Sequence, residues 1–189
     1  MNPTRTKPSP TRYVALLRAI NVGGHVVKMT DLRDIFQSLR FDGVETFIAS
    51  GNVIFDAPHG DADALEALIE QRLAKLLGYE VATFLRTPAE LAAAAAAEPF
   101  ADSGPPVVAH TLSVGFLKSM PSKEALLKIA ALASDVDDFR VIGRELYWRC
   151  RVRTSDSKVS GARLEKALSG PATLRNITTV RKLAAKYAR

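Results

Sequence analysis

The sequence predicts an α+β protein built from two ferredoxin-like (split β-α-β) halves, the second with its closing strand replaced by a C-terminal helix. Two observations lead to this prediction. Strand-like segments alternate with segments that have the apolar period of helices, and in the first half they follow the order β-α-β-β-α-β. The second half follows the order β-α-β-β-α-α, which lacks a final strand.

The first half opens with Tyr13–Arg18, whose residues are apolar on both faces, as in a central strand that is covered on both sides. Apolar residues spaced like one helix face follow, then two strands joined by Ser50-Gly51-Asn52. A split β-α-β unit has the strand order 4-1-3-2. The predicted strands are 13–18, 44–49, 53–55 and 81–85, and the predicted helices start near 30 and 61 and end near 39 and 77.

Prolines and Gly104 interrupt the pattern between residues 98 and 106, after a connecting helix that starts at Pro88. We therefore expect a flexible N-terminal arm (1–10), a first half with the connecting helix (11–104) and a second half (105–189). The second half is predicted to contain strands at 108–116, 139–142 and 145–152 and helices near 122–133, 160–168 and 178–187. A Gly143-Arg144 turn joins the last two of these strands.

Charge is distributed unevenly along the chain, whose formal net charge is +6. Residues 140–189 contain thirteen Lys or Arg residues and only three acids. Basic charge gathered in one quarter of a chain favours an anionic partner, either nucleic acid or a phosphorylated ligand. The alternative is that these cations only solubilise exposed faces.

Motifs at both ends resemble an uncharacterised family, the domain of unknown function 1697. They are Asn21-Val22-Gly23-Gly24, Met29 with Leu32-Arg33, Ser50-Gly51-Asn52-Val53 with Phe55, and Thr173 with Arg175-Asn176, Thr179-Val180 and Lys182-Leu183. The resemblance implies an α+β fold and a bacterial protein, and it implies no established activity. One departure is Ala19, where the family usually has Gly.

The first candidate site follows from the predicted topology. The loop after the first strand and the hairpin between the next two strands are expected at one sheet edge. Their backbone N–H groups and polar side chains suit a small-ligand or phosphate pocket. The alternative is that the glycines and asparagines only shape turns. The candidate ligand-binding residues are Asn21, Gly23, Gly24, Lys28, Ser50, Gly51 and Asn52.

The second candidate site is basic. Arg149, Arg151 and Arg153 alternate along a predicted strand, which places their guanidinium groups on one face, where they can bind phosphate oxygens in pairs. Acids of the other half could instead neutralise them. Arg175 and Asn176 precede the last helix and either contact an anion or cap that helix.

Catalytic motifs are scarce. The sequence has no zinc-ligand or nucleophile-elbow pattern, so no metal is expected, and cofactors and catalytic residues stay unknown. The single Cys150 excludes an internal disulfide and fits a reducing cytoplasm. No apolar segment is long enough to span a membrane, so we expect a cytoplasmic protein without a membrane partner.

Three functions are compatible with these features. The first is a binding protein that holds an anionic partner through its basic C-terminal half. The second is an enzyme acting on a small phosphorylated or carboxylated metabolite at the edge formed by Asn21–Gly24 and Ser50–Asn52. The third is an interaction module that forms a homodimer.

Overall fold

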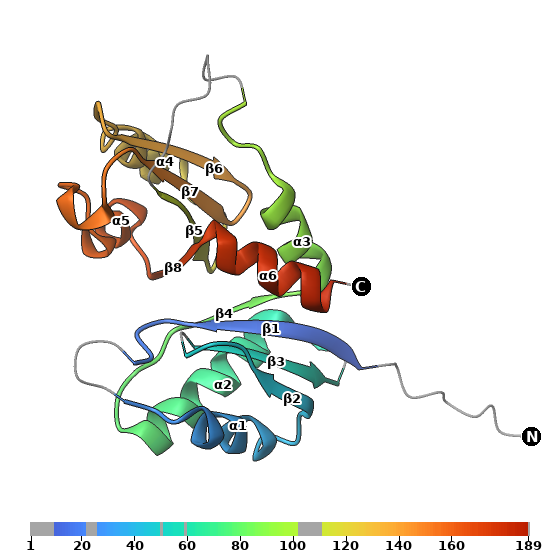
Figure 1. Ribbon diagram of the computed structural model, residues 1–189. Coiled ribbons are helices and arrows are strands. Elements are labelled where there is room, and N and C mark those ends of the chain that lie inside the picture. The colour runs from blue at the N-terminus through green and yellow to red at the C-terminus, as the bar shows by residue number, and fades with distance from the viewer. Residues whose placement is uncertain (1–9, 22–25, 50, 59, 102–110, 189) are drawn as a thin grey trace, which may run out of the picture. The chain divides into compact units, whose positions relative to one another are not determined.

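The computed structural model describes residues 10–21, 26–49, 51–58, 60–101 and 111–188 (Figure 1). By its internal contacts the chain divides into two compact units, Met1–Pro88 (unit 1) and Ala89–Arg189 (unit 2). Unit 1 contains ten basic and ten acidic residues, whereas unit 2 contains sixteen basic and ten acidic residues. The whole formal net charge of +6 therefore belongs to unit 2.

Unit 1 is a four-stranded antiparallel sheet with the order β2-β3-β1-β4 in its described part. This is the predicted 4-1-3-2 order read from the other edge, so the ferredoxin-like prediction for the first half is confirmed. Its strands are β1 (Thr11–Leu17), β2 (Asp42–Thr46), β3 (Asn52–Ala57) and β4 (Thr83–Arg86), and its helices are α1 (Met29–Gln37) and α2 (Ala62–Leu77).

Both helices of unit 1 pack on the same face of the sheet (Figure 1). Tyr13, Ala15 and Leu17 of β1 belong to the core under these helices. Val14 and Leu16 point to the opposite face and are also buried. The central strand is therefore buried on both faces, as its unbroken apolar sequence predicts.

Unit 2 has a second antiparallel sheet, with the order β6-β7-β5-β8. Helices α4 and α5 pack on one face, against a core that includes Leu146, Trp148 and Cys150 of β7. Helix α3 lies on the other face, where the Tyr147 hydroxyl donates to the Ala94 carbonyl (3.2 Å). The elements are α3 (Pro88–Ala96), β5 (Thr111–Leu117), α4 (Lys123–Ala130), β6 (Asp137–Ile142), β7 (Glu145–Cys150), α5 (Gly161–Leu168), β8 (Ala172–Asn176) and α6 (Ile177–Tyr187).

The closing strand of the second half is present, so the prediction that a helix replaces it is wrong. Strand β8 pairs with β5 from Ala172 to Asn176, and α6 follows it directly. The strand is short, and its polar Thr173 and Arg175 are nevertheless buried. A polar five-residue segment carries little of the apolar alternation that identifies a strand in a sequence.

The two units have the same residue types at corresponding positions of their central and edge strands, although their sequences show no clear repeat. Val14 of β1 lies opposite Arg86, and Val114 of β5 lies opposite Arg175. Both arginines are buried, and each donates from Nη1 to the preceding carbonyl, Leu85 O at 2.8 Å or Leu174 O at 2.9 Å. The second half therefore has the same four-stranded ferredoxin-like sheet as the first, and its last strand, β8, corresponds to β4.

Helix α3 belongs with unit 2, whereas the sequence-based boundary at residue 104 assigns it to the first half. Arg144 of unit 2 forms an ion pair with Glu90 of α3 (2.8 Å). Burial, together with the charge of Glu145, raises the pKa of the Tyr147 hydroxyl that contacts α3 to about 12. The proline-rich break that begins at residue 98 follows α3, and its residues 102–106 lie outside the described residues. The division by contacts falls before α3 instead, between Pro88 and Ala89.

Candidate functional site

The loop after β1 and the β2–β3 hairpin lie together at one edge of unit 1, as the topology argument expects. The Asn21 amide nitrogen donates to the Ala49 carbonyl (3.0 Å), and its Oδ1 accepts from the Val27 backbone N–H (2.6 Å). Asn21 thus ties the two segments together. Gly23, Gly24 and Ser50 of the predicted site lie outside the described residues.

Gly51 and Asn52 have structural roles at this edge. Gly51 has a φ of +74°, and a Cβ there would lie 3.0 Å from Cβ of Ile20. Asn52 is 0% exposed, and its side-chain amide donates to the Phe47 carbonyl (3.0 Å). Lys28 is exposed and immediately precedes α1. The buried Asn52 amide therefore supports the hairpin from inside.

Three non-glycine residues near this edge have a positive φ, the left-handed backbone conformation. Their φ angles are +59° for Ala19, +58° for Asn21 and +50° for Ile48. Asparagine tolerates this conformation, whereas alanine and the β-branched isoleucine are disfavoured in it. Such strain occurs at ligand sites and in tight turns alike.

The arginines of the basic candidate site are neutralised within unit 2. Asp138 Oδ2 accepts from Arg149 Nε (2.8 Å) and lies 2.7 Å from Arg151 Nη2. Arg153 Nε pairs with Asp156 (3.0 Å). The neutralising acids come from the same half of the chain and not from the other half. Moreover, β7 ends at Cys150, so Arg151 and Arg153 lie beyond the strand that was predicted to align them.

Arg175 and Asn176 serve the fold in the described structure. Arg175 is 8% exposed, and its Nη1 donates to the Thr173 hydroxyl (2.8 Å). Burial lowers the pKa of its guanidinium to about 10. The Asn176 side chain accepts from the Thr178 N–H (2.8 Å), which caps α6, the second of the two roles considered from the sequence.

A groove between α4 and α5 carries basic side chains that sequence analysis did not single out. This α4–α5 groove has a volume of about 370 Å³ and is lined by Lys128, Ala131, Leu132, Arg163, Lys166 and Ala167. In the described part of the chain, Arg163 and Lys166 take part in no ion pair. Lys128 pairs with Glu124 one turn away on the exposed surface of α4 (2.7 Å). Among the described residues, no acid lines the groove.

A second hollow, of about 420 Å³, adjoins the α4–α5 groove and shares Ala131, Leu132 and Arg163 with it. Its lining also contains Asp135, Asp137 and Asp156. The charge therefore changes from basic to mixed along the two hollows.

The buried carboxylate of Asp137, which lines this second hollow, accepts hydrogen bonds from three side chains around it. It accepts from Trp148 Nε1 (2.8 Å) and from the hydroxyls of Ser134 (3.2 Å) and Ser157 (2.8 Å). Burial, together with nearby Asp137, raises the pKa of the Cys150 thiol. A buried thiol with a raised pKa is a poor nucleophile, so Cys150 acts here as a core residue.

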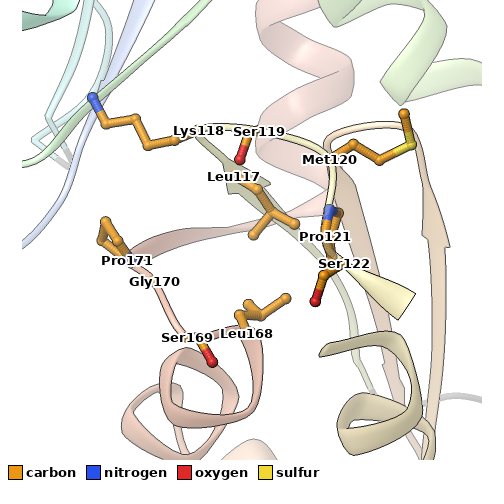
Figure 2. A pocket seen from close by; sticks show the side chains of 10 residues that line it. All are labelled: Leu117, Lys118, Ser119, Met120, Pro121, Ser122, Leu168, Ser169, Gly170 and Pro171. Carbon is orange, nitrogen blue, oxygen red and sulfur yellow. The ribbon is translucent and has the colours of Figure 1, made fainter. Parts of the chain in front are cut away.

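A third hollow, of about 270 Å³, lies between the β5–α4 and α5–β8 loops of unit 2 (Figure 2). Figure 2 shows that it is lined by the small side chains of Ser119, Ser122 and Ser169, with Leu117 and Leu168 beside them. Of the described residues that line it, Lys118 alone is charged. This composition offers less to an anion than the α4–α5 groove does.

Within the described residues, no group of His, Cys, Asp and Glu side chains could hold a metal ion. In the same part of the chain, no helix combines the length and apolar character needed to cross a membrane.

The fold places the chain among α+β proteins that contain two ferredoxin-like units. The chain belongs to the family described as protein of unknown function DUF1697, whose model matches residues 11–147. A solved structure titled as that of the conserved bacterial protein SP0830 from Streptococcus pneumoniae is similar, with a TM-score of 0.73 and 24% identity over 96% of this chain and 100% of that one. At this identity the likeness concerns the fold. No curated protein matches the chain.

Proposed function

We propose that this protein is a binding module that holds an anionic partner in the α4–α5 groove of unit 2. The observation that supports the proposal is the lining of that groove, where Arg163 and Lys166 have no ion-pair partner among the described residues and Lys128 is paired only with the exposed Glu124. In contrast, Arg149, Arg151 and Arg153 already hold carboxylates. Basic side chains that have no internal counter-charge are the ones available to a ligand.

The basic residues at the rim of the groove come from two helices, Lys128 from α4 and Arg163 and Lys166 from α5. Arg163 and Lys166 are three residues apart on α5 and so project from one side of that helix. The Arg163 guanidinium is oriented by its hydrogen bond to the Lys158 carbonyl (2.8 Å). A fixed guanidinium loses less side-chain entropy on binding an anion, which strengthens the contact.

The test is a binding titration against two anionic probes, a labelled mixed-sequence oligonucleotide and labelled polyglutamate, at low salt. We expect at least one probe to bind, with an affinity that falls as salt rises. Reversing both unpaired cations (R163E/K166E) should weaken binding about tenfold or more, whereas K182E on α6 should change it little. No binding of either probe at about 50 μM protein, a Kd too weak for a specific complex, would reject the proposal.

A small-ligand site at the edge of unit 1 stays a second candidate, supported by the left-handed Ala19 and Ile48. The residues predicted to bind there that the structure describes have other partners. Asn21 and Asn52 are both bonded to backbone groups of the hairpin or the loop. The edge therefore supports a ligand site less directly than the groove does.

A further inference from the structure

We infer that the α4–α5 groove receives an acidic amphipathic helix of a partner protein. This inference rests on the proposed function, because it names the chemistry of the anionic partner at the same groove. It depends on three features of unit 2, which are the charge of the rim, the apolar floor and the acids of the adjoining hollow.

The rim sets the charge of the partner. Arg163 and Lys166 on α5 and Lys128 on α4 flank the groove from both helices. A helix laid between them would place acidic side chains against both rims. The Lys128–Glu124 pair is exposed and can exchange partners, because such surface pairs contribute little.

The floor makes the partner amphipathic and not merely acidic. Between the cations the groove is lined by Ala131, Leu132 and Ala167. Leu127 of α4 is not itself a lining residue, but it is 72% exposed and lies four residues before the lining residue Ala131, on the same side of the helix. An exposed leucine beside an apolar groove gains from burial, so a partner needs apolar residues on the face that enters.

The adjoining hollow disfavours a nucleic-acid strand. A phosphate backbone carries negative charge at every nucleotide, and continuing past the groove it would meet Asp135 and Asp156, the latter paired with Arg153, beside a further lysine, Lys158. Furthermore, in the part of the chain that the structure describes, no aromatic side chain lines the groove or the adjoining hollow. Single-stranded nucleic acids are usually held by stacking on such rings. A short helix, in contrast, can place all its acidic side chains against the basic α4–α5 groove and none in the adjoining hollow.

The test uses the full chain and a synthetic peptide of about 14 residues, or four helical turns, with leucines at positions i, i+3, i+4 and i+7 and mostly glutamate elsewhere. One control peptide has the same composition in scrambled order, and another has lysine in place of glutamate. A labelled mixed-sequence oligonucleotide is titrated in parallel. The protein variants are R163E/K166E, Leu127→Ser and, as a matched control away from the groove, K182E.

We expect the acidic amphipathic peptide to bind at least about tenfold more tightly than either control peptide. R163E/K166E should weaken it about tenfold or more, and Leu127→Ser about fivefold, while K182E leaves it within about twofold. Leu127 is exposed, so its substitution tests docking without disturbing the core. Circular dichroism confirms that each variant is folded.

Other outcomes separate this inference from the proposed function. Oligonucleotide binding that depends on Arg163 and Lys166, without peptide binding, would overturn the inference and retain the proposed function. Equal binding of the ordered and scrambled acidic peptides, or no effect of Leu127→Ser, would show that charge alone acts and would also overturn it. Binding of neither anionic probe would reject both.

Discussion

Replacing Asn52 by alanine decides whether the Ser50-Gly51-Asn52 hairpin is a ligand site or a structural turn. Asn52 is 0% exposed and donates to the Phe47 carbonyl at 3.0 Å. Removing the amide leaves the partly buried Phe47 carbonyl without this donor, which costs about 1–3 kcal/mol. The space vacated by the shorter side chain adds about 1 kcal/mol. We therefore expect Asn52→Ala to lower the free energy of unfolding by about 2–4 kcal/mol.

The assay is urea unfolding of the full chain followed by circular dichroism, with Asn176→Ala as the matched control. Asn176 is exposed and caps α6, so its loss should cost only about 1 kcal/mol. A loss below about 0.5 kcal/mol for Asn52→Ala, within the range of an ordinary surface substitution, would refute this reasoning. The Asn52 amide would then be available to a ligand.

Three further predictions concern other parts of the chain. Ala19→Gly should stabilise the protein by about 0.5–1 kcal/mol in urea unfolding, because relief of the left-handed alanine (about 1–2 kcal/mol) exceeds glycine's entropy cost, and a destabilised variant would contradict this. Cys150 should resist a disulfide reagent at pH 8 in the native protein and react after denaturation, because burial raises the pKa of its thiol and leaves little thiolate; rapid native reaction would contradict it. Residues 1–88 expressed alone should self-associate, because Val14, Leu16 and Ile54 are apolar and lie on the sheet face opposite α1 and α2, and a monomeric, cooperatively folding fragment would contradict that.

The strand order and most helices of unit 1 follow from local patterns in the sequence. Apolar residues at helical spacing predict α1 and α2, and the two-faced apolar sequence of β1 predicts a central strand. Strand β8 was missed because Arg175 is normally expected at a surface, whereas the fold buries it. The equivalence of Arg86 and Arg175 appears only when strand register is known.

The ion pair between Arg149 and Asp138 could be predicted from the sequence. A two-residue turn at Gly143-Arg144 places Asp138 directly opposite Arg149, which the register confirms. Opposite charges at facing positions stabilise a strand pair, so this hairpin already indicated that Arg149 has an internal counter-charge. The α4–α5 groove had no such signal, because Lys128 and Arg163 come together only through the packing of two helices.

Backbone amide shifts measured by NMR during a titration with the acidic amphipathic peptide test the central claim most directly. The claim is that the anionic partner binds between α4 and α5 of unit 2. We expect the perturbed amides to cluster on residues 127–132 and 161–167 and to return to their free positions in R163E/K166E. Perturbations confined to the edge around Asn21 and Asn52, or unchanged in that variant, would contradict the claim.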